Sequence, residues 1–110
     1  MQPMSAFDQD FLAYALLYAS EADFELSDEE REYILSKVDS KSFSKSLKEI
    51  QTDNDIQRIN KIKGRFKHLN YTEEHLKILI DEMFNLFNID GNYSNLERNL
   101  MLGLKRLLKS

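Results

Sequence analysis

The hydrophobic periodicity of this 110-residue chain constrains its fold more than any other feature. Apolar residues recur at intervals of three and four along most of the chain, whereas the alternation of a half-buried strand is nearly absent. Only three glycines and one proline interrupt this pattern. A chain of this length is sufficient to build one hydrophobic core. We therefore expect an all-α fold with a single domain over residues 1–110.

The periodicity predicts six helices joined by short connections. They are expected at about 6–21, from 27 onward, and at about 41–51, 53–69, 72–87 and 94–110. The fifth is rich in Leu, Ile, Met and Phe, and we expect it to be the central helix. Ser5 with Asp8 resembles a capping box at the start of the first helix. Gly64 favours a kink in the fourth, because glycine weakens a helix by about 1 kcal/mol relative to alanine.

The net charge of −4 conceals an uneven distribution. Residues 1–55 carry 5 Lys/Arg against 13 Asp/Glu, whereas residues 56–110 carry 10 against 6. The acidic half argues against general nucleic-acid binding and is compatible with cations or a basic partner. The absence of cysteine excludes disulfides and thiolate metal sites. Because no signal segment or membrane-length apolar run is evident, we expect a cytoplasmic protein without membrane insertion.

Two segments of the chain match each other without a gap, Ala15–Ile34 and Glu82–Met101, at a constant offset of 67 residues. The aligned pairs are Asp23 with Asp90, Leu26 with Tyr93, Ser27 with Ser94, Glu30 with Glu97 and Arg31 with Arg98. In both copies an apolar helix leads into an acidic turn, and Ser-x-x-Glu opens the next helix. The repeat therefore predicts two pseudo-symmetric helix–acidic turn–helix units.

Two interpretations of these turns remain open. In the first, Ser-x-x-Glu is a capping box worth about 1 kcal/mol, and the two aspartates only form turns. In the second, the turns supply oxygen ligands to one divalent cation, Ca²⁺, Mg²⁺ or Mn²⁺. A conventional EF-hand is not expected, because Ala19 and Leu86 occupy the first ligand position of the loop. The candidate metal ligands are Asp23, Glu25, Glu30, Asp90, Asn92 and Glu97.

The two acidic turns also carry a family resemblance. The segments ASEADFELSDEE (Ala19–Glu30) and IDGNYSNLE (Ile89–Glu97) resemble the motifs of the TerB-like family. That family includes the tellurite-resistance protein TerB and the N-terminal region of the DjlA co-chaperone. The chain departs from the family pattern at Phe24, where glycine is usual, and at Asn88 and Ile89. The resemblance implies an all-helical domain in bacterial stress or tellurium-ion resistance, with metal sensing or binding.

Enzymatic motifs are missing from the sequence. It has no Gly-rich phosphate loop, no H-E-x-x-H and no G-x-S-x-G. His68 is expected on a solvated face, and His75 at the surface or beside a helix cap. We therefore expect a non-enzymatic protein, either a stress-response module that binds a divalent cation or a metal-free protein–protein interaction domain.

One run of basic residues stands out, and it consists of Arg58, Lys61, Lys63, Arg65 and Lys67. On a helix these side chains surround an apolar stripe, which favours a solvated face. A docking surface for another protein is the alternative. The same run could also pair with the acidic half of a second copy, giving a head-to-tail homo-oligomer.

Overall fold

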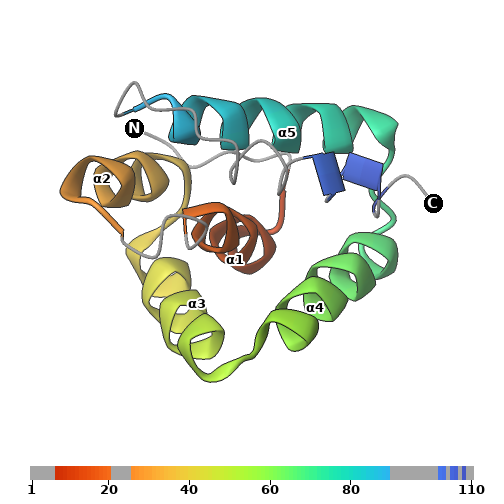
Figure 1. Ribbon diagram of the computed structural model, residues 1–110, viewed down its shortest axis with the longest axis horizontal. Coiled ribbons are helices and arrows are strands. Elements are labelled where there is room, and N and C mark those ends of the chain that lie inside the picture. Colours follow the sequence, from red (N-terminus) through yellow and green to blue (C-terminus); the bar gives the residue numbers. More distant parts are fainter. Residues whose placement is uncertain (1–6, 21–25, 90–101, 104, 107, 109–110) are drawn as a thin grey trace.

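The computed structural model describes residues 7–20, 26–89, 102–103, 105–106 and 108. Within these residues the chain forms helices and no strands (Figure 1). The helices are α1 (Gln9–Ser20), α2 (Asp28–Lys37), α3 (Ser40–Thr52), α4 (Asp55–His68) and α5 (Glu73–Phe87). The all-α prediction is confirmed, and the observed bounds lie within a few residues of those expected. None of the described helices is long and apolar enough to cross a membrane.

The sixth predicted helix, at about 94–110, lies mostly outside the described residues. Its described residues 102, 103, 105, 106 and 108 are helical. Leu108 is buried against the core. The count of six helices and the pseudo-symmetric repeat therefore stay predictions.

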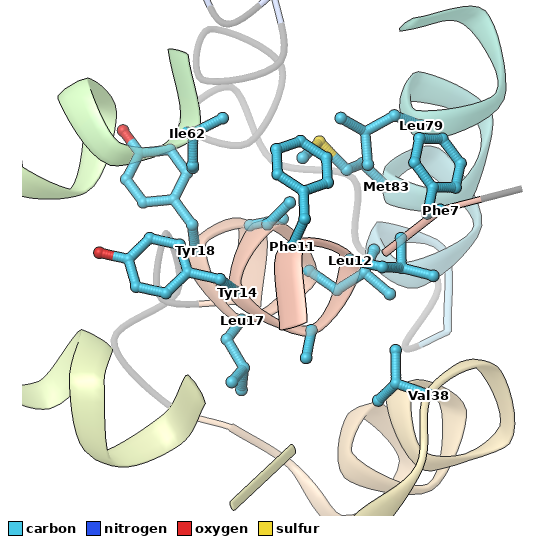
Figure 2. Packing of buried hydrophobic residues seen from close by; sticks show 14 of the residues in the cluster. Phe7, Phe11, Leu12, Tyr14, Leu17, Tyr18, Val38, Ile62, Leu79 and Met83 are labelled. Atoms are coloured by element: carbon cyan, nitrogen blue, oxygen red, sulfur yellow. The ribbon is translucent and has the colours of Figure 1, made fainter. Parts of the chain in front are cut away.

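The central helix is α1, and every residue from Phe11 to Ser20 is buried. The other four helices pack around it (Figure 1). Its labelled side chains in Figure 2 point in several directions, towards Ile62 of α4 and towards Leu79 and Met83 of α5. A helix that is apolar on all sides must be covered on all sides. The ten residues Phe11–Ser20 carry no charge, so every side of this part of α1 can be buried.

The prediction that the fifth helix is central was wrong. One side of α5 is buried, through Leu76, Leu79 and Met83, whereas Asp81 and its neighbours on the opposite side are exposed. The charged residues of α5 are spaced so that one face stays in water, which makes it an amphipathic outer helix.

Side-chain caps set the helix starts. Ser27 forms the predicted capping box at the start of α2, and Asp39 and Asn54 cap α3 and α4. At α1 the side chain of Asp8 is the cap. Its Oδ1 accepts a hydrogen bond of 3.0 Å from the backbone N–H of Phe11, while Ser5 lies outside the described residues.

Helix α4 runs unbroken through Gly64, so the expected kink is absent. Burial of Ile62 and Phe66 on either side of the glycine outweighs its weak helix propensity. The helix ends in a left-handed turn at Asn70, whose φ is 57°. The N–H of Tyr71 then donates to the carbonyl of Phe66 at 3.3 Å, which closes a Schellman motif.

Candidate functional site

Glu30 is the one predicted cation ligand that the structure describes. It is buried, and its Oε1 accepts a hydrogen bond of 3.0 Å from the backbone N–H of Ser27. In return the Glu30 N–H donates to Ser27 Oγ at 3.1 Å. The capping box predicted for the first turn is therefore confirmed. Its carboxylate caps the start of α2, as the first of the two interpretations of the acidic turns predicts.

The other five predicted ligands, Asp23, Glu25, Asp90, Asn92 and Glu97, lie outside the described residues. Across the part of the chain that the structure describes, no cluster of three or more His, Asp or Glu side chains is arranged to hold a metal ion. The shared cation site stays a prediction that rests on the sequence repeat.

The repeat can be compared where both of its copies are described. Residues 15–20 and 82–87 align, and both segments are helical. Their surroundings differ, because the first lies in the buried helix α1 and the second in the outer helix α5. In α5 the Phe84 side chain is 43% exposed, where the aligned Leu17 is buried. The matched sequences therefore do not have matched environments.

An ionic network joins α4 to α3 and α1. Glu49 Oε2 accepts hydrogen bonds from Lys61 Nζ at 2.9 Å and from Arg65 Nη2 at 2.5 Å. Asp53 Oδ2 accepts from the same Lys61 Nζ at 2.7 Å and from the Tyr14 hydroxyl at 2.7 Å. The Arg65 guanidinium also lies 5.1 Å from the centre of the Tyr14 ring. The network connects three helices through side chains that are largely satisfied by each other.

The pKa shifts in this network are those of groups that are paired with one another. Hydrogen bonds from Lys61 and Tyr14 lower the pKa of Asp53. Burial would raise the pKa of Glu49, but hydrogen bonds from Arg65 and Lys61 lower it overall. Burial and the hydrogen bond to Asp53 raise the pKa of Tyr14 well above its usual value. These shifts move the three groups away from neutral pH, whereas a general acid or base needs a pKa near it.

Arg58 caps the end of α3. Its Nε and Nη2 donate to the carbonyl oxygen of Ile50 at 3.0 and 2.7 Å, and Nη1 lies 3.5 Å from Asp55 Oδ1. The last carbonyls of a helix lack partners within the helix, and a cation there also suits the helix dipole.

The prediction that the whole basic run forms a solvated face was wrong. Arg58, Lys61 and Arg65 contact α3, and of the five only Lys67 is fully exposed. Lys63 is half-exposed. The sequence analysis allowed this run to pair with acidic residues of a second copy. In the structure Lys61 pairs with Glu49 and Asp53 of the same chain.

A second polar contact, which the sequence analysis missed, joins α2 to α5. The Tyr33 hydroxyl donates to Glu82 Oε1, and Lys37 Nζ lies 3.5 Å from Glu82 Oε2. The Lys37 ammonium is also 5.4 Å from the centre of the Tyr33 ring. Burial and the bond to Glu82 raise the pKa of Tyr33. Glu82 lies among the apolar positions of α5, and this placement could have indicated the contact, because a buried carboxylate needs hydrogen-bond or ionic partners.

The two histidines lie where the sequence placed them. His68 is exposed at the end of α4. His75 lies in the first turn of α5, where its Nδ1 accepts a hydrogen bond of 3.0 Å from the backbone N–H of Thr72. Its ring also stacks on Tyr71 with centres 4.5 Å apart. His75 thus caps a helix and packs on an aromatic ring.

Two surface clefts are found among the described residues. The smaller, of about 240 Å³, lies near the start of α1, and its charges include the pairs Lys45–Asp10 and Arg65–Glu49. The larger, of about 450 Å³, lies along α5 and also borders Lys105 near the C-terminus. It is lined by Glu73, Glu74, Leu76, Lys77, Ile80, Asp81 and Lys105. Its lining combines apolar side chains with three carboxylates and two ammonium groups.

Large apolar side chains are also exposed on the outer helices. They are Leu35 on α2, Ile56 on α4, Ile78 and Phe84 on α5, and Leu102 near the C-terminus. Single exposed apolar residues are ordinary, but neighbouring ones on one helix are typical of a binding surface. Helix α5 has two of them, Ile78 and Phe84, which stand six positions apart, and it also supplies most of the lining of the larger cleft, so its surface is the best candidate site.

Comparisons with protein-family models, with curated proteins and with solved structures gave no match. The resemblance to the TerB-like family therefore continues to rest on the two acidic turns of the sequence.

Proposed function

We propose that this chain is a non-enzymatic helical domain that binds another protein through the outer face of α5 and needs no metal for it. One contrast carries the proposal. The polar side chains between helices are engaged with one another, in the α3–α4 network and in the Tyr33–Glu82 contact. Helix α5, in contrast, borders the larger cleft, and its Ile78 side chain is partly exposed.

The lining of the cleft indicates the chemistry of the partner. Leu76 and Ile80 provide an apolar floor, and the carboxylates of Glu73, Glu74 and Asp81 outnumber the two ammonium groups of Lys77 and Lys105 around it. A partner segment that combines apolar anchors with basic side chains would bury the first against the floor and pair the second with the carboxylates. A short amphipathic helix with lysine or arginine on its flanks has this character.

A capture experiment tests the proposal. The wild-type protein is immobilised beside an α5 variant with Asp81→Lys and Phe84→Ser, and beside a control variant with Gln51→Lys on the exposed side of α3. A partner should be recovered equally with and without chelator by the wild type and the control, and lost by the α5 variant. Loss of the partner on chelation would contradict the metal-free interpretation.

The matched acidic turns favour a second candidate function. In it the chain is a cytoplasmic bacterial stress-response module, similar to the TerB-like family, that binds a divalent cation. The ligands would be Asp23, Glu25, Glu30, Asp90, Asn92 and Glu97. A ligand that binds the folded state at about 100 times its Kd raises the free energy of unfolding by about 2.7 kcal/mol.

Calorimetry tests this second candidate directly. Millimolar Ca²⁺, Mg²⁺ or Mn²⁺ should raise the melting temperature of the wild type but not of the Asp23→Asn, Asp90→Asn double variant. An unchanged melting temperature with all three ions would refute it.

A further inference from the structure

The outer face of α2 combines acid with one apolar anchor. Asp28, Glu32 and Leu35 stand at positions i, i+4 and i+7, which places them on one side of the helix. All three are exposed, and the Leu35 side chain is 40% accessible. We refer to these three residues as the acidic face.

The outer face of α4 has the opposite charge around a similar anchor. Ile56, Asn60, Lys63 and Lys67 stand at positions i, i+4, i+7 and i+11, again on one side of a helix. Ile56 is the most exposed large apolar residue described, at 72%. These four residues form the basic face, and they are the part of α4 that the ionic network with α3 does not use.

Gly64 lies beside the basic face. It is exposed, and a Cβ added there would meet no atom within 4 Å. The glycine therefore leaves the backbone of α4 accessible to a second helix, because it removes the side chain that would hold that helix away.

Helices α2 and α4 lie on opposite sides of α1 (Figure 1). The residues of both faces are exposed or half-exposed, so the two faces point away from the core. One chain cannot bring its own two faces together. Two copies can, if α2 of one lies against α4 of the next. A contact between different surfaces of identical chains is heterologous, and it continues into a ring or an open chain.

The spacing of the residues fits an antiparallel pairing of the two helices. Leu35 and Asp28 are seven residues apart, as are Ile56 and Lys63, so each pair spans about 10.5 Å along its helix axis. When Leu35 lies against Ile56 and the helices run in opposite directions, Asp28 reaches Lys63. In the same register Glu32 comes opposite the Asn60 amide.

We propose that the acidic face of α2 docks on the basic face of α4 in a second copy of this chain. This self-association is separate from the α5 surface of the proposed function and uses none of its residues. It joins one apolar pair with exposed charges, and exposed ion pairs each contribute about 0–1 kcal/mol. The association is therefore weak and sensitive to salt.

Sedimentation velocity provides the first test. At about 50 mM salt the average mass of the wild type should rise with protein concentration, and at about 500 mM salt the rise should be smaller, because screening weakens exposed ion pairs. A wild type that stays monomeric at every concentration in low salt would overturn the proposal.

Two single variants provide the second test. Leu35→Lys breaks the acidic face, and Ile56→Asp breaks the basic face. A lysine in the last turn of α2 and an aspartate in the first turn of α4 both suit the helix dipole, so the fold should be retained. Circular dichroism and thermal unfolding check this. Each variant alone should be monomeric.

Mixing the two variants gives the decisive result. Each still has one intact face, so an equimolar mixture should form dimers and nothing larger. The control Ile78→Lys, on the outer side of α5, should associate like the wild type. A mixture that stays monomeric, or variants that still associate alone, would overturn the head-to-tail arrangement. These results are independent of partner capture by α5, so either proposal can fail without the other.

Discussion

Helices α1 and α4 are held in place by different forces. In α1 every residue from Phe11 to Ser20 is buried, and none is charged. In α4 only Ile62 and Phe66 are buried, and the helix is tied down by ion pairs and by a guanidinium. The comparison shows that one small core can contain a helix fixed by burial beside a helix fixed by burial and polar pairing together.

This difference makes the packing of α4 more sensitive to pH and salt than the burial of α1. Apolar burial changes little with pH or moderate salt. Partly exposed ion pairs weaken at low pH, where the carboxylates are protonated, and at high salt, where the charges are screened. Four measurements distinguish the two helices.

The largest effect is expected in α1. Leu16→Ala removes a fully buried side chain and leaves a cavity, so the free energy of unfolding should fall by about 2–5 kcal/mol. Urea unfolding followed by circular dichroism measures it. Leu35→Ala, at an exposed position of α2, is the matched control and should change the value by about 0.5 kcal/mol or less. A loss at Leu16 as small as the control's would show that α1 is not the tightly packed centre.

The second effect concerns the end of α3. Arg58→Met keeps most of the apolar stem but removes both donors to the Ile50 carbonyl. The expected loss is about 1.5–3 kcal/mol, the range for a hydrogen bond that involves a charged group. Lys67→Met, at an exposed position of the same helix, serves as the control. If the two variants were equally stable, the guanidinium would not be holding α4 against α3.

The third experiment is an acid titration. The pKa values of Glu49 and Asp53 are lowered in the folded protein, so their contribution is complete above the unfolded values of about 4. It is lost as pH falls through the lowered folded values. The melting temperature of the wild type should therefore drop by several degrees between about pH 5 and pH 2. In a Glu49→Gln, Asp53→Asn variant this drop should be smaller, and equal slopes would contradict an ionic role for the network.

The smallest effect is expected at Gly64. Alanine there meets open space and removes the helix penalty of glycine, so Gly64→Ala should raise the free energy of unfolding by about 0.5–1 kcal/mol. Thermal unfolding measures the gain. A loss instead would mean that the backbone at this position packs more closely than its exposure indicates.

The helices themselves could be predicted from the sequence, because their signals are local. Ser27, Asn54 and Thr72 precede apolar periodic segments, and each begins a helix within a residue or two of the expected position. The position of α1 could have been predicted too. Its ten uncharged residues were a stronger signal for the centre than the large apolar residues of α5, which are interrupted by charge.

The polar contacts could not be predicted, because they join residues far apart in the sequence. Tyr14 and Asp53 are separated by 39 positions, and Tyr33 and Glu82 by 49. Helical periodicity gives the face of a residue but not the helix opposite it. For the candidate site, the Ser27–Glu30 capping box was predicted and confirmed, whereas the cleft beside α5 arises from packing and has no sequence motif.

The burial of α1 also has a consequence during synthesis. The ribosome makes this helix before any of the helices that cover it, and α5 ends 67 residues after Ser20. At roughly 5–20 residues per second its apolar surface stays uncovered for roughly 3–13 s. The segment at the centre of the finished domain is therefore the one most exposed to chaperones and to aggregation while the chain is made.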